Sequence, residues 1–524
     1  MAFLLHQLLS ESAAKYPGRE AIIFGGQTIT YAELERESNK LANKLIAIGI
    51  EKEIPVGIHM NRGIKSIIAA FGILKAGGTY VPIDPMSPPR RLEYIIGKCG
   101  IKSLITIQGK LKNIDEVFSG DPPLDNLLVM DGLPKTSGLA GTTKLIDCQN
   151  LSDELGEKAP DVAVIDSDPA YILFTSGSTG DPKGVMISHL NSLTFINSVH
   201  DFLGITKEDR FSNICPLHFD MSVFDIFVAV KAGASVVIIP EMTATFPIKL
   251  AELISGSKIS VWNSVPSALS LLASLSNLDN FDFSSMRLVL FAGEVFPIKY
   301  LRLLQGYMPE AKFCNMYGQT EANTSTYYWV GDLPPDAAAA LPIGRPLPNF
   351  EVFALDEGGD RVSRPGQEGE LYVRSSSVAL GYYGDAERTG KSFVKNPLKH
   401  DFEEIVYKTG DLVSVDSVGN YVFLGRKDHM IKSRGYRIEI GEIETALSSH
   451  PEIKNAAVVP IPDELIGNRI IAFVVLVTPG KIEKEEILKY CSKRLPKYMI
   501  PENIEFRNSL PTTSSGKIDR KALA

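Results

Sequence analysis

The chain has 524 residues, 44% of them hydrophobic and 22% charged, and a formal net charge of −8 at pH 7. Its length exceeds the size at which one hydrophobic core stops growing, so we expect two or more domains, and its composition excludes a disordered or fibrous protein. The negative charge, with no block of Lys and Arg to offset it, argues against nucleic acid as a partner.

Cysteine usage and the N-terminus both favour a cytoplasmic protein. The five cysteines are scattered without a C-x-x-C pair, which predicts neither a disulfide framework nor a zinc site and fits a reducing compartment. The apolar N-terminus is interrupted by His6 and Gln7 and has no basic segment, which predicts an amphipathic helix and not a secretion signal. No stretch approaches the ~20 apolar residues that cross a bilayer, so we expect no membrane association.

Helical and extended patterns alternate along the first part of the chain. Helical periodicity over residues 31–48 and 64–74 is interleaved with strand-like runs at 56–60 and 80–84. The same rhythm continues with apolar runs at 103–106, 235–239, 261–262 and 288–291. This alternation predicts an α/β fold, with helices layered on parallel sheets in a large N-terminal domain over residues 1–424.

After Leu380 the chain changes to short β-rich segments at 405–407, 412–414 and 421–424, followed by Gly-Arg-Lys-Asp at 425–428. The remaining patterns are strand 438–440, helix 441–449, strands 455–459 and 469–477, and helix 484–495. They predict a compact α+β domain of about one hundred residues at the C-terminus.

The stretch from Thr175 to Gly184, Thr-Ser-Gly-Ser-Thr-Gly-Asp-Pro-Lys-Gly, follows an apolar run and looks built to hold a nucleotide phosphate. Its glycines free backbone N–H groups to surround an anion, its hydroxyls add donors, and Lys183 adds a charge for the β and γ oxygens. Pro182 before the lysine and glycine after it depart from the Walker pattern, which disfavours a P-loop motor or GTPase. Composition alone would favour a flexible surface loop. The candidate nucleotide-binding residues here are Thr175, Ser176, Gly177, Ser178, Thr179 and Gly180.

Eight segments in order, these ten residues among them, resemble the motifs of the adenylate-forming ligases. That superfamily comprises acyl- and aryl-CoA synthetases, firefly luciferase and the adenylation domains of nonribosomal peptide synthetases. The other matching segments are HFDMSVF at 218–224, LFAGE at 290–294, YGQTE at 317–321, YKTGD at 407–411, GRKD at 425–428, SRGYRIE at 433–439 and GKIDR at 516–520. The resemblance covers essentially the whole chain and implies the fold of that superfamily, with a mobile lid domain over residues 429–524.

The resemblance implies that a carboxylate and ATP form an acyl-adenylate and pyrophosphate, after which a thiol captures the acyl group. Attack at the α-phosphorus concentrates negative charge, which magnesium, lysine and backbone donors must stabilise. By position, Glu321 is similar to the family's Mg²⁺-binding glutamate and Thr320 to its phosphate-contacting hydroxyl. Lys183 is the lysine of the phosphate loop.

Four further residues match positions that hold the nucleoside. Tyr317, followed by Gly318, is similar to the aromatic residue that stacks on adenine. Asp411 matches the carboxylate that accepts both ribose hydroxyls, a task for a bidentate acceptor. Arg426 also faces the nucleotide by position. Without the resemblance, these residues would be interpreted as turn residues and an exposed arginine.

In the C-terminal part of the chain, one residue is expected to act in catalysis and another to serve as the hinge of the small domain. Lys517 resembles the lysine that bridges carboxylate and phosphate oxygens, where a long cationic side chain neutralises two anions as they approach. Asp428 matches the hinge of residues 425–428, about which the small domain turns after adenylation. His429 stands where most of the family carries an acidic or polar residue. The segment 433–439 resembles the loop that lines the pantetheine tunnel, with Gly435 allowing close backbone approach.

Asp220 matches the aspartate that pairs with the substrate ammonium in members that activate amino acids. A buried carboxylate without a cationic partner is costly, so the residue itself argues for an amine in the pocket. The alternative is a helix N-cap, because the residues after Asp220 could open a helix.

The resemblance also places a substrate pocket, whose lining is mostly apolar and suits a small, uncharged side chain. Asn263 could take one hydrogen bond there from a hydroxyl, a thiol or a ring edge. The segments 260–269 and 288–300 look like those of stand-alone prolyl-carrier-protein ligases, which makes proline the leading candidate. Serine, cysteine, alanine and β-amino acids stay open, since a missing methylene is worth only ~1–3 kcal/mol. The candidate pocket residues are Asp220, Met221, Phe224, Asn263, Leu290, Ala292, Met316, Thr324 and Ser325.

We recognise no carrier-protein, condensation or reductase segment, so we expect the phosphopantetheine thiol of a carrier protein in trans, or an excised domain. Coenzyme A is the less favoured acceptor. An acyl- or aryl-CoA synthetase is the alternative enzyme, and a non-catalytic ATP-binding module is the alternative from another class. Luciferase-like oxygenation is disfavoured because its substrates carry no amine that would need Asp220.

Overall fold

The computed structural model describes residues 2–118, 123–134, 143–149, 151, 156–177, 180–275, 277–331, 333, 340–427, 430–511 and 520–523.

An eight-stranded sheet, in the order β19-β9-β8-β4-β3-β5-β6-β7, forms one half of the large domain. Strands β8, β4, β3, β5, β6 and β7 run parallel, whereas β9 and β19 are antiparallel additions at one edge. The strands are β3 (Pro55–His59), β4 (Thr79–Pro82), β5 (Ser103–Thr106), β6 (Asn126–Val129), β7 (Lys144–Asp147), β8 (Pro169–Thr175), β9 (Lys183–Ser188) and β19 (Gly381–Tyr382).

A second sheet of nine strands, in the order β16-β15-β14-β13-β12-β10-β11-β1-β2, forms the other half. Its centre, from β14 to β1, is parallel, and antiparallel strands close both edges. The strands are β1 (Glu20–Phe24), β2 (Gln27–Thr30), β10 (Arg210–Asn213), β11 (Ser235–Ile238), β12 (Val261–Ser264), β13 (Leu288–Ala292), β14 (Lys312–Gln319), β15 (Asn323–Val330) and β16 (Arg345–Pro346).

Helices join these strands and cover both sheets, as the sequence predicts. The signals are local: Thr30 and Glu33 form a capping box that starts α2, and Pro89 and Gly100 bracket α4. A continuous apolar core extends through both sheets and the helices between them. The helices are α1 (Leu5–Lys15), α2 (Tyr31–Ala47), α3 (Ile64–Lys75), α4 (Pro89–Cys99), α5 (Gln108–Phe118), α6 (His189–Phe202), α7 (Met221–Val223), α8 (Ala229–Ala232), α9 (Glu241–Ala244), α10 (Pro247–Gly256), α11 (Pro266–Ala273), α12 (Ile298–Tyr307) and α13 (Ala386–Ser392), with the π-helix η2 (Phe224–Val228) and the 3₁₀ turn η3 (Leu278–Asn280).

A five-stranded antiparallel sheet completes the large domain and corrects one expectation. The two short strands predicted at 405–407 and 412–414 are one continuous strand, β21. Its Thr-Gly-Asp centre forms a bulge against β18, with Gly410 at φ +76°, while Asp411 stays paired with Arg426 of β22. The predicted domain boundary after residue 424 falls inside β22, two residues before that strand ends. The strands are β17 (Glu351–Leu355), β18 (Glu368–Arg374), β20 (Phe393–Lys395), β21 (Ile405–Val415) and β22 (Tyr421–Arg426).

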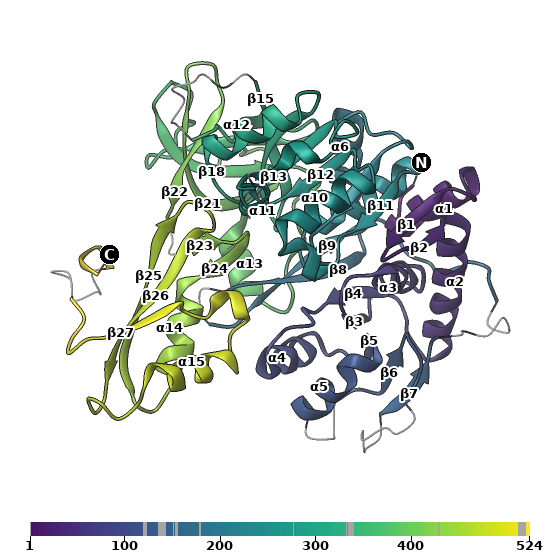
Figure 1. Cartoon of the computed structure of the whole chain (residues 1–524), viewed down its shortest axis with the longest axis horizontal. Coiled ribbons are helices and arrows are strands. Elements are labelled where there is room, and N and C mark those ends of the chain that lie inside the picture. The colour runs from purple at the N-terminus through teal and green to yellow at the C-terminus, as the bar shows by residue number, and fades with distance from the viewer. Residues whose placement is uncertain are drawn as a thin grey trace.

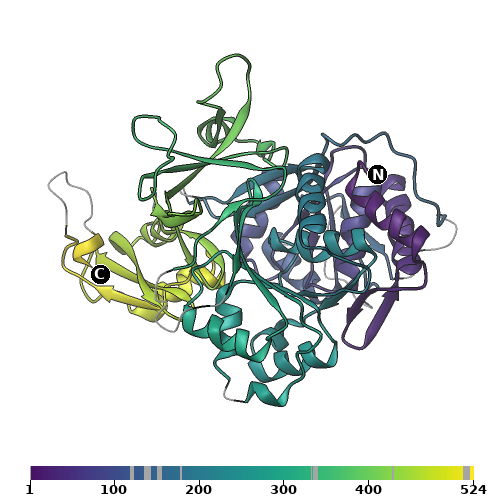
Figure 2. The ribbon, with the colours of Figure 1, turned by 90° about the horizontal axis from the view of Figure 1, so that it is seen from above.

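The small C-terminal domain is an α+β unit with its own apolar core, built as expected from strands and two helices. In both views it lies at the opposite end of the molecule from helix α1 (Figures 1 and 2). Its elements are β23 (Met430–Ser433), β24 (Tyr436–Glu439), α14 (Ile440–Ser448), β25 (Ile453–Asp463), β26 (Gly467–Leu476), α15 (Lys484–Ser492), η4 (Lys497–Met499), β27 (Asn503–Phe506) and η5 (Arg520–Ala522).

A mixed α/β fold with a large N-terminal and a small C-terminal domain is therefore confirmed. Across the described ranges, we find no helix with both the length and the apolar character needed to cross a membrane.

Candidate active site

A cavity of about 630 Å³ lies where the small domain meets the carboxyl ends of the parallel strands of the nine-stranded sheet. Ligand sites in open α/β sheets form at such strand ends. Strands β12, β13 and β14, the segment before η2, and residues 430–437 of the small domain all contribute to its wall.

The structure brings most of the predicted site residues to this one cavity. Ser325 does not line it, since its hydroxyl is buried and donates to the backbone oxygen of Asn323. Ser178, Thr179, Asp428 and Lys517 lie outside the described residues. The predicted residues that line the cavity are Thr175, Ser176, Asp220, Met221, Phe224, Asn263, Leu290, Ala292, Met316, Tyr317, Gly318, Thr320, Thr324, Asp411 and Arg426.

The predicted phosphate loop connects β8 to β9, and Thr175 pairs with Lys183 across its base. Two of its glycines are required by the backbone. A Cβ at Gly177 would lie 2.0 Å from the carbonyl oxygen of Asp181, and Gly180 has φ +95°. The buried hydroxyl of Thr175 has no hydrogen-bond partner in the described part of the chain. An unpaired buried hydroxyl is costly, which fits a group that a ligand satisfies.

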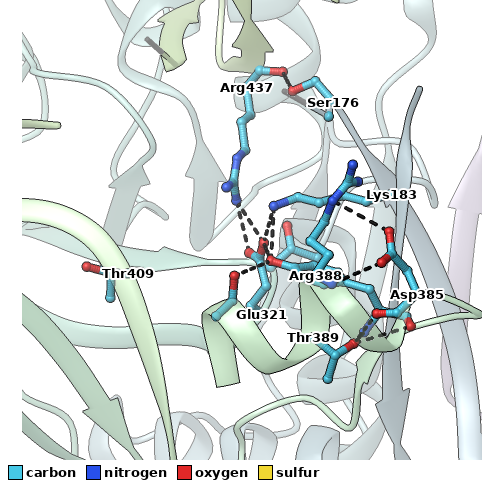
Figure 3. Close-up of polar contacts among 12 residues, drawn as sticks. Ser176, Lys183, Glu321, Asp385, Arg388, Thr389, Thr409 and Arg437 are labelled. Carbon is cyan, nitrogen blue, oxygen red and sulfur yellow. Dashed lines mark hydrogen bonds and ion pairs between the residues drawn. The ribbon is translucent and has the colours of Figure 1, made fainter. Parts of the chain in front are cut away.

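Glu321 lies at the centre of a cluster of charged and hydroxyl groups beside this loop (Figure 3). Its carboxylate is fully buried and pairs with Lys183 Nζ at 2.9 Å and Arg437 Nη1 at 2.9 Å. The Tyr382 hydroxyl donates to the same carboxylate at 2.8 Å. Arg437 comes from the small domain, so this ion pair joins the two domains.

These contacts set the protonation of the cluster. Burial alone would raise the pKa of Glu321, but Arg437 and Lys183 hold it far below the usual range, so the carboxylate is ionised. Burial lowers the pKa of Lys183 to about 8, with Arg437 acting in the same direction and Glu321 opposing it. Glu321 is thus an anion that the protein itself neutralises in this arrangement.

Asp411 is surrounded by donors, of which Tyr317 and Arg426 were predicted for the same nucleoside site and Gln319 was not. Its carboxylate accepts hydrogen bonds from the Tyr317 hydroxyl, the Gln319 amide and the Arg426 guanidinium. Asp411 lies within β21, directly after Gly410, whose φ of +76° marks a bulge in that strand. Donors from β14 and β22 therefore hold the carboxylate of Asp411, on β21, at the cavity wall.

Asp220 lies at the start of α7, yet its side chain makes no capping hydrogen bond to the helix. Its carboxylate instead accepts a hydrogen bond from the Thr320 hydroxyl at 2.8 Å and lines the cavity. The N-cap alternative for this side chain is therefore not what the structure shows. Thr320 thereby connects the YGQTE segment to the predicted amino-acid pocket.

The small domain closes over the phosphate loop through contacts that the sequence did not reveal. The Ser176 hydroxyl donates to the backbone oxygen of Arg437 at 2.7 Å. The Gly177 N–H donates to Glu442 at 3.3 Å, and Arg91 pairs with the other oxygen of Glu442 at 2.8 Å. A carboxylate from the small domain therefore occupies a backbone donor that was predicted to bind phosphate.

The segment 433–439 also inserts beside the pocket, where Gly435, Tyr436 and Arg437 line the cavity. Gly435 donates its N–H to Glu294, has φ +81°, and would place a Cβ 2.4 Å from Val265. Only a glycine allows this approach. Arg437, Glu442 and Glu294 are functional candidates that sequence reasoning did not single out, although Arg437 and Glu294 lie within matched motifs.

Two family models match the chain: "AMP-binding enzyme" over residues 9–383 and "AMP-binding enzyme C-terminal domain" over residues 442–517. The chain is 34% identical to an L-proline--[L-prolyl-carrier protein] ligase of Pseudomonas fluorescens, over 99% of both chains. It is 33% identical to zwittermicin A synthase ZmaJ of Bacillus cereus, over 100% of this chain and 95% of that protein. It is also 33% identical to bacitracin synthase 3 of Bacillus licheniformis, over 99% of this chain and 8% of that protein.

Solved structures of similar enzymes share the fold of this chain. IdnL1 superposes with a TM-score of 0.79 at 27% identity, over 98% of this chain and 99% of that one. The artificially fused adenylation-PCP di-domain NpsA-ThdA of Klebsiella oxytoca gives a TM-score of 0.78 at 25% identity, over 96% and 93% of the two chains. Matching models over both domains, full-length relatives and the shared fold lead to one conclusion: the chain belongs to the AMP-binding enzyme family.

Proposed function

We propose that this chain activates a small amino acid with ATP as an aminoacyl-adenylate and transfers the aminoacyl group to the phosphopantetheine thiol of a carrier protein. The observation that carries the proposal is Asp220. Its carboxylate lines the same cavity as Tyr317 and Asp411, so an amino group and a nucleoside can be held in one space.

In the first half-reaction, an oxygen of the substrate carboxylate attacks the α-phosphorus of ATP and pyrophosphate leaves. Asp220 would pair with the substrate ammonium, while Asp411, Arg426 and Tyr317 would hold the nucleoside. Thr175, with its unpartnered hydroxyl, and Lys183 would contact the phosphates. Lys517 would neutralise the two approaching anions. In the second half-reaction, a thiolate attacks the acyl carbon and AMP leaves.

Glu321 is the residue that would hold Mg²⁺. Magnesium is commonly bound by one or two carboxylates together with substrate phosphates, so a single buried, ionised carboxylate beside the phosphate loop fits this ion. In the structure, the small domain contacts the phosphate loop and Glu321, an arrangement that we call docked. Arg437 and Lys183 both pair with the Glu321 carboxylate in the docked arrangement. Arg437 would therefore have to withdraw before Glu321 could serve a metal–nucleotide complex.

The amino acid is a small, uncharged one, since Met221, Phe224, Leu290 and Met316 leave a compact apolar pocket. The similarity to the Pseudomonas ligase supports L-proline as the candidate. The compact ring of proline also suits a small apolar pocket. Serine, cysteine, alanine and β-amino acids fit the same volume.

A carrier protein as acyl acceptor is supported by two of the similar proteins. The name of one specifies a prolyl-carrier protein, and the other was solved fused to a carrier domain. We propose a carrier protein acting in trans.

The test is amino-acid-dependent exchange of labelled pyrophosphate into ATP, across the standard amino acids, β-alanine, and several fatty and aryl acids. Exchange with one small amino acid is the expected result, and proline is the first to try. Exchange only with non-amino acids would mean an acyl- or aryl-CoA synthetase and would overturn the role of Asp220.

A further inference from the structure

Three buried polar side chains form a chain of hydrogen bonds behind the substrate pocket. Asp225, in the π-helix η2, has no exposed surface. Its Oδ2 accepts from the Asn213 amide at 3.0 Å and its Oδ1 from the Asn263 amide at 2.8 Å. Within the described ranges, no cation pairs with this carboxylate at ion-pair distance. The two amides are its polar partners.

The backbone fixes the direction of this chain of hydrogen bonds. The Asn213 nitrogen also donates to the backbone oxygen of Cys215 at 3.0 Å, so the Asn213 amide cannot turn without losing two bonds. Asn213 therefore always presents its nitrogen to Asp225. When Asp225 is ionised, both of its oxygens accept, so Asn263 presents its nitrogen as well.

The orientation of the Asn263 amide decides whether its oxygen or its nitrogen faces the substrate. Asn263 lines the cavity, and its nitrogen is held by Asp225. Its oxygen accepts no hydrogen bond from the residues that the structure describes. Leu290, its neighbour on strand β13, is apolar, as are Phe224 and Met316 of the cavity lining. The pocket therefore offers an unsatisfied hydrogen-bond acceptor beside apolar side chains.

We propose that Asp225 is a positioning residue that holds the Asn263 amide oxygen toward the pocket, so that the enzyme selects a compact amino acid whose side chain carries a hydrogen-bond donor. This inference rests on the proposed function and narrows it to a substrate class: small side chains with a hydroxyl or thiol, or a ring that bears one. Within the candidates named above, it favours serine, cysteine or a hydroxylated proline over L-proline itself. An apolar isostere leaves the amide oxygen buried and unpaired, which costs binding energy.

The first experiment compares matched pairs that differ by one donor. Pyrophosphate exchange is measured with L-serine against L-alanine, L-threonine against L-valine, and trans-4-hydroxy-L-proline against L-proline. Burial raises the pKa of Asp225 to about 8, so assays are run at pH 9, where its carboxylate is ionised. We expect the donor-bearing member of the active pair to have a kcat/KM at least about tenfold higher.

The second experiment reverses the polarity of the pocket. In Asp225→Asn, the anchored Asn213 still needs an acceptor and takes the oxygen of the introduced amide. The introduced nitrogen then faces Asn263, which must turn its oxygen away from the pocket. We expect the donor preference to be lost or reversed, mainly through KM. Asn263→Leu, which removes the acceptor altogether, provides a second variant with the same expected loss.

Asp209→Asn is a control at a second buried aspartate, which pairs with Arg287 and lies outside the cavity. In this control, the ratio of kcat/KM between the donor-bearing and the apolar member of each pair should equal that of the unmodified enzyme. Exchange at equal rates within every pair overturns the inference and leaves the proposed function intact, as does an unchanged ratio in Asp225→Asn. Absence of exchange with every amino acid overturns both.

Discussion

Asp220 differs from Glu321 and Asp411 in forming no ion pair with a cation among the residues that the structure describes. Glu321 and Asp411 are paired with Lys183 or arginine, whereas the Asp220 contact that the structure shows is the neutral Thr320 hydroxyl. A carboxylate held this way in a largely apolar cavity is stabilised when an ammonium joins it.

Replacing Asp220 by Ala is expected to lower amino-acid-dependent exchange by about 30-fold or more, because truncating one partner of a desolvated charge pair costs about 2–5 kcal/mol. Binding of ATP, measured by calorimetry without amino acid, should be retained. Asp201→Ala, at an exposed aspartate, is the control. Full exchange activity in Asp220→Ala would overturn the assignment of the ammonium site.

The burial of His59 makes the stability of the large domain depend on pH. It is fully buried in β3, and neither ring nitrogen has a partner in the described part of the chain. Burial, aided by Lys110, lowers its pKa from 6.5 to about 4. A base whose folded pKa is lowered contributes stability above pH 6.5, and this contribution is lost as the pH falls from 6.5 toward 4.

Between pH 7.5 and 5.0 the His59 contribution amounts to roughly 2 kcal/mol of unfolding free energy. His59→Leu should therefore lose less stability than the unmodified protein over that interval, in urea titrations followed by the fluorescence of Trp262 and Trp329. His400→Leu, at an exposed histidine, should keep the original pH dependence. An identical slope in all three proteins would contradict the prediction.

At the scale of elements, local patterns predicted the α/β layers well. Caps and periodicity marked α2 to within one residue, and buried apolar runs marked β5 at both ends. The continuity of β21 was missed because its Thr-Gly-Asp centre has the composition of a turn, while its pairing with β18 and β22 is a tertiary property. The role of Asp225 was missed for a related reason, since nothing local shows that it is buried against two amides.

The connection between β22 and β23 is the element in which the predicted hinge, Asp428, falls. Strand β22 ends at Arg426 and β23 begins at Met430, and each belongs to a different sheet. A few residues between two rigid units suffice to turn one against the other.

Asp428→Pro should restrict this turn, because proline fixes φ near about −65°. We expect pyrophosphate exchange to stay within about threefold of the unmodified rate, while transfer to a carrier-protein thiol falls about tenfold or more. The two half-reactions are measured separately on the same preparation. Asp401→Pro, in an exposed loop, should affect neither. Equal losses in both half-reactions would refute the hinge.

At the scale of the whole molecule, the site is made by two domains that the sequence does not place relative to each other. Arg437 and Glu321 are 116 residues apart, and Glu442 and Gly177 are 265 apart. The motifs predicted that both segments serve the site, but not that the small domain covers the phosphate loop with its own carboxylate. Under the proposed function, docking of the small domain would therefore compete with a metal–nucleotide complex for Glu321 and for the Gly177 N–H.

Arg437 is the residue through which this competition can be tested. Arg437→Met removes the interdomain pair with Glu321 and keeps the bulk of the side chain, so the docked arrangement loses stability relative to the open one. Domain coupling of about 1–3 kcal/mol corresponds to roughly 5- to 150-fold, so MgATP should bind at least about fivefold more tightly while thiol transfer slows by a similar factor. Arg434→Met is the matched control, since Arg434 lies in the same segment but pairs with Glu502 on the surface. Unchanged MgATP affinity in Arg437→Met, measured by calorimetry, would show that docking and nucleotide binding do not compete.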